Sequence, residues 1–217
     1  MSEKINFKLF KPFGSTIAKA ELPLELIKDF KDDLKSIKQD KEKQKNHNWG
    51  KRLVGAISEE YLISPEIMLK WKRKFFDPII ASYFNAHFKN QKVKSILINS
   101  AWYVCQKSGE YNPLHNHCEY IGKNYHLSCV GYLSLPESMK STKSAKEHND
   151  FSGEIEFVEG SENMFTDCRY RVKPEVRQWF LFPNSLNHIV YAFDSDKNEE
   201  RISFSFNATI NFEENIN

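Results

Sequence analysis

Residues 201–212 read RISFSFNATINF, with polar and apolar residues alternating at every step. Successive side chains of a β-strand point to opposite faces, so this pattern predicts a strand with Arg201, Ser203 and Ser205 on one face. Such a face can meet water on an ordinary half-buried strand, or it can line a cavity inside a barrel. In a cavity the arginine needs an anionic partner, because an unpaired buried charge is costly. Arg201 and Ser203 would then form a clamp for one carboxylate of a small dicarboxylate.

Further short β-rich segments precede this strand. They span residues 93–105, 127–135, 154–158, 179–182 and 189–193, and turn residues separate them. Many short strands without intervening helices predict a sandwich or a jelly-roll barrel. The polar segment 137–150 has no periodicity and is predicted to be a surface loop, with a role as a lid as the alternative.

The N-terminal part has a different, mainly helical character. After a short β-like piece at residues 5–10, apolar residues at three-to-four spacing predict a helix from about Pro23, followed by a polar run at 39–48 that sustains no apolar face. A second helix is predicted to begin with Ser64 as N-cap and Pro65 at its first position. Because Pro78 lacks an amide proton, either a kink or a meeting of two helices is expected near Asp77. Both helices are expected to pack on the outside of a sheet.

These patterns together predict an α+β protein: a double-stranded β-helix (jelly-roll or cupin-like) barrel with N-terminal helices packed on the outside. We expect a single domain over residues 1–217, with 1–92 as mainly helical support and 93–212 as the jelly-roll core.

Composition narrows the classes of function. The 31 basic and 29 acidic residues give a net charge of +2, which provides no electrostatic signature of nucleic-acid binding. No apolar run approaches a membrane span, and the N-terminus has no apolar core of a signal peptide, so a cytoplasmic location is expected. The cysteines show no C-x-x-C spacing and are predicted to be free thiols rather than zinc ligands. They are Cys105, Cys118, Cys129 and Cys168.

Three of the seven histidines are candidates for a metal site. His115 and His117 lie two positions apart, so in an extended segment both side chains point to one face and can bind one ion. His188 follows 71 positions later, at the start of a β-like run. Imidazole suits Fe, Zn, Cu and Ni alike, so the residue type does not select the metal. Two nearby histidines on a loop are also common as polar surface residues, and the pair alone does not decide between the two interpretations.

The order of these features resembles a known family. Five features taken in order resemble the 2-oxoglutarate/Fe(II)-dependent oxygenases. They are His-x-His, Gly131-Tyr132-Leu133, the segment GEIEF at 153–157, the segment FPNSLNH at 182–188 and RISFSFN at 201–207. The resemblance is to a bacterial and phage subgroup related to the prolyl hydroxylases. It covers residues 93–212, and its specificity lies in the ordered set rather than in any one motif.

The resemblance implies an Fe(II) centre held by His115, His117 and His188. The family's usual first motif is His-x-Asp, so His117 in the aspartate position is a departure that implies three neutral ligands. Glu119 is an alternative carboxylate ligand. Arg201 and Ser203 would anchor 2-oxoglutarate, and Tyr103 and Tyr132 match positions where the family places hydroxyls near this co-substrate, although each is equally compatible with a core tyrosine.

The implied activity is hydroxylation of an unactivated C–H bond with O2, yielding succinate and CO2, with ascorbate as a reductant. The substrate would be a peptidyl residue such as proline, or a small molecule; nucleic acid and membrane partners are not expected, and the sequence leaves the oligomeric state open. Two alternatives remain: a three-histidine cupin-like metalloenzyme that does not use 2-oxoglutarate, and a non-catalytic β-barrel interaction module.

Overall fold

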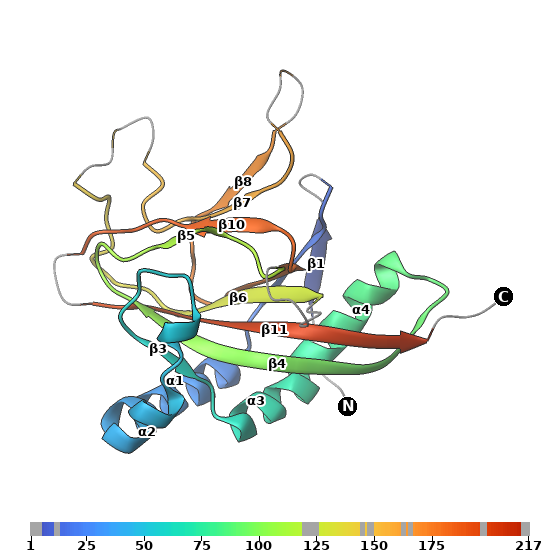
Figure 1. Ribbon diagram of the computed structural model, residues 1–217, viewed down its shortest axis with the longest axis horizontal. Helices are drawn as coiled ribbons and strands as arrows, with labels where there is room; N and C mark the ends of the chain where they lie inside the picture. The colour runs from blue at the N-terminus through green and yellow to red at the C-terminus, as the bar shows by residue number, and fades with distance from the viewer. Residues whose placement is uncertain are drawn as a thin grey trace.

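Two β-sheets face each other in a computed structural model of the chain, and helices cover the outer face of the larger sheet (Figure 1). The structure describes residues 6–10, 14–118, 126–143, 146, 150–161, 164, 167–195 and 199–213. Glu119, the alternative metal ligand, lies outside these residues. The two sheets form a double-stranded β-helix, as predicted, although they do not close into a barrel.

The larger sheet contains seven strands in the order β1-β2-β9-β6-β11-β4-β3. Its centre is the long antiparallel pair of β11 and β4, in which Ser203 lies opposite Val104 and Phe204 opposite Tyr103. The strands are β1 (Phe7–Phe10), β2 (Ile17–Glu21), β3 (Glu60–Leu62), β4 (Lys92–Gln106), β6 (Leu127–Ser134), β9 (Gln178–Pro183) and β11 (Arg201–Glu213).

The smaller sheet contains four strands in the order β5-β10-β7-β8. These are β5 (Asn112–His115), β7 (Ile155–Val158), β8 (Arg169–Val172) and β10 (Asn187–Val190). The pairing of β10 with the edge strand β5 places His188 directly opposite His115. A buried apolar cluster that includes Ile155, Phe157 and Phe182 fills part of the space between the two sheets. The register of this small sheet therefore brings two of the three candidate histidines together.

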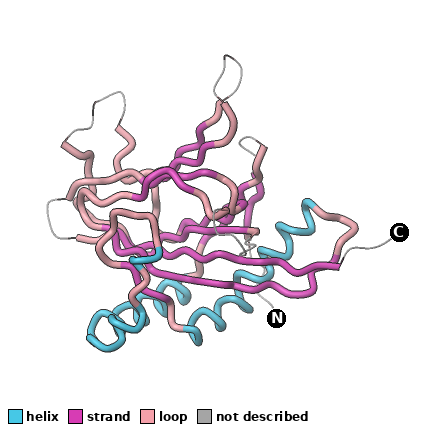
Figure 2. Tube along the Cα trace, in the orientation of Figure 1, coloured by secondary structure: helices cyan, strands magenta, loops and turns pink. Residues whose placement is uncertain are grey.

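The helices lie together on one side of the sheets, as the cyan segments of Figure 2 show. Helix α1 buries the apolar residues that define its predicted face, from Leu26 to Ile37, against an aromatic core that includes Trp179, Phe204 and Phe206. The apolar face of β11 thus packs on helices, and its polar face is left for the space between the sheets. The helical elements are α1 (Leu24–Gln39), α2 (Lys41–His47), a 3-10 turn (Gly50–Arg52), α3 (Pro65–Trp71), a π-helical segment (Lys72–Phe76) and α4 (Asp77–His87).

Two details of the helices differ from the predictions. Residues 41–47 form helix α2 although none of its residues is buried, because the Asp40 carboxylate caps it by accepting hydrogen bonds from the amides of Glu42 and Lys43. Ser64 precedes α3, but its side chain does not cap the helix; its hydroxyl donates to Asp33 of α1 at 2.5 Å instead. Near Asp77 the structure has the predicted meeting of two helices, since the π-helical segment ends at Phe76 and α4 begins at Asp77.

Strands β2, β3 and β8 were not anticipated. The first two show that the N-terminal region adds strands to the larger sheet as well as helices, and β8 is an edge strand of the smaller sheet. The four cysteines are free thiols, as predicted. Within the described part of the chain, no helix combines the length and apolar character needed to cross a membrane.

Candidate metal and co-substrate site

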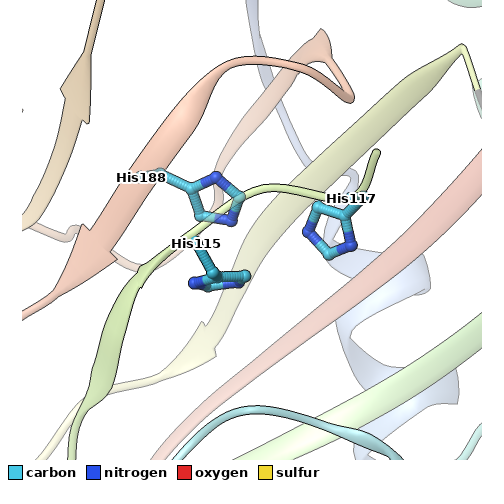
Figure 3. A group of neighbouring side chains, drawn as sticks. All are labelled: His115, His117 and His188. Atoms are coloured by element: carbon cyan, nitrogen blue, oxygen red, sulfur yellow. The ribbon is translucent and has the colours of Figure 1, made fainter. Parts of the chain in front are cut away.

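Three imidazoles converge between the two sheets (Figure 3). His115 ends β5, His117 follows it on the adjoining loop, and His188 belongs to β10. One ligand atom from each ring lies within 4.8 Å of the others. The ring centroids of His115 and His188 are 4.2 Å apart, and His117 lies 5.4 Å from the first and 5.3 Å from the second. The sequence prediction that these three residues meet is therefore confirmed.

Backbone carbonyls fix the orientation of two of the rings. Nδ1 of His115 lies 2.7 Å from the carbonyl oxygen of Pro113, and Nδ1 of His188 lies 3.0 Å from that of Leu186. A carbonyl oxygen can only accept, so Nδ1 carries the proton in both rings and Nε2 presents its lone pair. This is the arrangement that orients histidines in metal centres, where the remote nitrogen donates to a carbonyl or a carboxylate.

Burial keeps the three imidazoles neutral. Desolvation lowers the pKa of His115, and desolvation with the neighbouring His115 lowers the pKa of His117 to about 4. The pKa of His188, which is buried in the same place, is lowered well below its usual value for the same reasons. Neutral imidazoles offer lone pairs to a cation near pH 7, whereas protonated rings would repel it.

Arg201 lies in the same cavity and is only 2% exposed. Its Nη1 donates to the carbonyl oxygen of Gly153 at 2.7 Å, and its Nη2 donates to the side-chain oxygen of Gln106. Both acceptors are neutral, and Nε has no partner among the described residues. Burial lowers the pKa of Arg201, although an arginine stays charged in a protein. Among the described residues, the guanidinium therefore has no anionic partner of the kind that a buried charge requires.

Tyr132 and Ser203 complete this end of the cavity. Tyr132 is 1% exposed, its hydroxyl has no hydrogen-bond partner within the described part of the protein, and its ring centroid lies 5.9 Å from the guanidinium carbon of Arg201. Burial raises its pKa to about 12, so the hydroxyl stays protonated and can donate. Ser203 lines the same cavity two residues after Arg201, as the alternation of β11 predicts.

Tyr103 does not line the cavity of the three histidines, and its position fits the alternative interpretation as a core tyrosine. Tyr103 pairs with Phe204, which belongs to the apolar face of β11, and its side chain packs against Phe30 of α1 with ring centroids 5.9 Å apart. Its hydroxyl donates to Asp33 at 2.8 Å. It therefore lies on the helix-covered face of the larger sheet, away from the histidines.

Two further cavity residues, Trp102 and Glu60, were missed in the sequence, as was Gln106, which accepts a hydrogen bond from Arg201. Trp102 lies beside His117 with ring centroids 6.4 Å apart. Gln106 and Trp102 alternate with Tyr103 and Cys105 on β4, and the strand is buried on both faces there, so the pattern gives no indication of which face lines the cavity. Glu60 belongs to a three-residue strand that is too short to give a periodic signal.

These residues fit an Fe(II) ion with 2-oxoglutarate. Three imidazoles from one side leave further coordination positions open, and imidazole suits iron. The guanidinium without an anionic partner and the tyrosine hydroxyl without an acceptor match the needs of a carboxylate. A dicarboxylate bound beside a metal ion would give these polar atoms the partners that they lack among the described residues.

Comparison with known proteins agrees with this chemistry. Residues 100–207 match the model of a family described as "Putative 2OG-Fe(II) oxygenase". No curated protein sequence matches the chain.

Solved structures share the fold at low identity. A prolyl-4-hydroxylase from Pseudomonas putida has a TM-score of 0.56 at 13% identity, covering 88% of this chain and 91% of its own. A prolyl hydroxylase from Trichoplax adhaerens, solved with a peptide fragment of the hypoxia inducible factor oxygen degradation domain, has a TM-score of 0.55 at 12% identity, covering 88% of this chain and 82% of its own.

HygX from Streptomyces hygroscopicus, solved with nickel, 2-oxoglutarate and hygromycin B, has a TM-score of 0.51 at 11% identity, covering 92% of this chain and 84% of its own. At such identities the likeness establishes the fold, and the family model adds the class of enzyme. The chain belongs to the 2OG-Fe(II) oxygenases, enzymes that use Fe(II), 2-oxoglutarate and O2.

Proposed function

We propose that this protein is a hydroxylase in which His115, His117 and His188 hold Fe(II), and Arg201 and Ser203 anchor the far carboxylate of 2-oxoglutarate. The observation that carries this proposal is the juxtaposition of three neutral imidazoles with a buried guanidinium that has no anionic partner among the described residues. The bound iron and 2-oxoglutarate supply the oxidising chemistry, with succinate and CO2 as co-products.

The residues of the chain bind and orient the reactants. The carbonyls of Pro113 and Leu186 hold His115 and His188 with Nε2 free, so the metal site needs little rearrangement on binding. Tyr132 donates its hydroxyl to the co-substrate carboxylate beside Arg201. Phe182 and Val190 belong to the apolar wall of the cavity, which keeps water from the reacting centre.

The third neutral ligand distinguishes this site from the usual pair of histidines with a carboxylate. His117 adds no negative charge, so the bound ion keeps a higher net positive charge. We expect this to strengthen the attraction between the metal and the anionic co-substrate. The function therefore depends on 2-oxoglutarate and metal binding together.

For the substrate we propose a C–H bond of a peptidyl residue, on the basis of the fold shared with prolyl hydroxylases, one of which was solved with a peptide. A small-molecule substrate is the alternative, since HygX shares the fold and was solved with hygromycin B.

The direct test is turnover of 2-oxoglutarate without a substrate. Purified protein supplied with Fe(II), ascorbate and 2-oxoglutarate should form succinate slowly, and His188→Ala should form none. Glu66→Gln, an exposed change on α3, is the matched control and should behave as the wild type. Wild-type protein that neither forms succinate nor binds 2-oxoglutarate would contradict the proposal.

A further inference from the structure

Glu60 is a buried acid in the same cavity that the metal and co-substrate chemistry does not use. It is 2% exposed and lines the cavity together with Trp102 and Val104. Its Oε2 has no hydrogen-bond partner within the described part of the chain. Buried carboxyl groups are normally paired, and an orphaned one at a binding site indicates a missing ligand.

The sheet register places Glu60 at a definite position relative to the co-substrate anchors. Glu60 lies opposite Val104, and Val104 lies opposite Ser203, so the three side chains form one row across the sheet. Two strand spacings separate Glu60 from Ser203, or ~10 Å. At this distance the carboxyl group of Glu60 cannot bind the same carboxylate as Ser203, although both residues line one cavity.

No cationic group donates a hydrogen bond to Oε2 of Glu60 within the described part of the chain. Burial, with a smaller contribution from Glu110, raises the pKa of Glu60 to about 8. Arg52 also borders the cavity, but it is exposed and its guanidinium carbon lies 4.5 Å from the ring centroid of Trp49. A Cβ added to Gly50 would lie 3.4 Å from Oε2 of Glu60, so the backbone of the 3-10 turn passes close to this carboxyl group.

We propose that Glu60 is a specificity-determining residue whose carboxyl group releases its proton to solvent when the substrate binds and accepts a hydrogen bond from an ammonium or guanidinium group of that substrate. This inference rests on the proposed function, and it narrows the substrate class to molecules or peptide residues that carry such a cation. A cationic nitrogen supplies both the missing donor and the opposite charge, which an apolar or anionic substrate cannot do. The cation is held at Glu60 while the C–H bond to be hydroxylated faces the three histidines.

The test measures binding of small cations directly. Protein loaded with Zn(II) and 2-oxoglutarate is titrated with methylguanidinium and n-butylammonium, and the indole N–H signal of Trp102 is followed by NMR. Methylurea and 1-butanol are the uncharged counterparts. We expect saturable shifts with the cations and binding at least about tenfold weaker for the uncharged probes, because a charge-assisted hydrogen bond is lost.

Variants of Glu60 then test whether its carboxyl group is the acceptor for the cation. Glu60→Gln should weaken cation binding at least about tenfold, Glu60→Asp should retain part of it, and the exposed control Glu66→Gln should bind as the wild type. The comparison of charged with uncharged probes uses wild-type protein only, so it remains decisive if Glu60→Gln does not fold.

Three outcomes would overturn the inference: equal binding of charged and uncharged probes, no saturable binding up to about 100 mM, or unchanged cation binding in Glu60→Gln. The first is also the result expected if a protonated Glu60 donates to a substrate carbonyl. Formation of succinate by wild-type protein from the same batch, loaded with Fe(II) in place of Zn(II), separates the two proposals. Succinate without selective cation binding retains the hydroxylase and removes only the role of Glu60.

Discussion

The guanidinium of Arg201 is the main evidence for co-substrate binding. Arg201 is buried, contacts two neutral acceptors, and keeps Nε without a partner among the described residues. Replacement by alanine removes the charge and the paired donors, and we expect the dissociation constant for 2-oxoglutarate to rise about 100-fold. Arg201→Lys should recover only part of this loss, because an ammonium cannot form the paired contacts of a guanidinium. Isothermal titration under anaerobic conditions with Mn(II) in place of iron measures both.

A metal enzyme that does not use 2-oxoglutarate gives the opposite result. In that case Arg201→Ala would leave metal binding intact, and neither the wild type nor the variant would bind 2-oxoglutarate. The same titration therefore separates the oxygenase from the cupin-like alternative.

The raised pKa of Glu60 predicts that the stability of the metal-free protein depends on pH. Its pKa is about 8 in the folded chain, against a reference value of 4.5. The folded state thus favours the protonated form of Glu60. The stability that depends on this proton is fully present below pH 4.5 and is lost as the pH rises through 8. Urea unfolding of Glu60→Gln, which cannot ionise, should show a stability advantage over the wild type that grows across this range, by up to ~5 kcal/mol. A constant difference at every pH would show that Glu60 ionises freely.

At the scale of elements, Asp33 joins helix α1 to two neighbours. Its carboxylate accepts from the amide and hydroxyl of Ser64, which precedes α3, and from the hydroxyl of Tyr103 on β4. Asp33→Ala should lower the free energy of unfolding by about 2–3 kcal/mol, because it leaves the buried tyrosine hydroxyl without an acceptor. In a Tyr103→Phe background the same change should cost about 1 kcal/mol less. Urea unfolding of the four proteins measures this coupling.

Tyr103→Phe also tests the corrected position of this residue. The side chain lies under α1, so the variant should bind 2-oxoglutarate as the wild type does. Weaker binding of 2-oxoglutarate by the variant would indicate that the Tyr103 hydroxyl contacts the co-substrate after all.

The strong periodic signals of the sequence identified the main elements. The alternation along β11 and the spacing of Leu26, Phe30 and Leu34 on α1 predicted both the strand and the helix that covers it. Strand β3 has only three residues, and β8 reads Arg-Tyr-Arg-Val with exposed charges, so neither carries a clear pattern. Helix α2 was missed because a cap, rather than an apolar face, accompanies it.

The site was predictable to the extent that it depends on residue type. His115, His117 and His188 were identified from spacing and resemblance, and Arg201 from the parity of its strand. The sequence did not show which face of β4 carries Tyr103, because residues 101–106 are buried on both faces of the strand. Which face lines the cavity is decided by the pairing of Val104 with Ser203, and that tertiary contact is not encoded locally.

At the scale of the whole molecule, the metal site joins distant parts of the chain. His115 and His188 lie on different strands of the smaller sheet, and the adjoining loop supplies His117. We propose that the chain forms a single oxygenase domain, in which the helices support the larger sheet and the smaller sheet carries the metal ligands.

Metal binding should therefore stabilise the entire fold. At a free Mn(II) concentration of about 100 times the dissociation constant, the gain is about 2.7 kcal/mol. This corresponds to a rise in Tm of roughly 5–10 °C for a chain of this size. His188→Ala should abolish the rise, and His87→Gln, which changes an imidazole bonded to Thr16 outside the site, should retain it. An equal rise in His188→Ala would indicate that the metal binds elsewhere.

The most direct test of the central claim is anaerobic equilibrium dialysis that measures Fe(II) and 2-oxoglutarate bound to the same protein. The account predicts one Fe(II) per chain in the wild type, little in His188→Ala, and 2-oxoglutarate binding that requires both the metal and Arg201. Fe(II) bound equally by wild type and His188→Ala, or 2-oxoglutarate bound equally by wild type and Arg201→Ala, would contradict it.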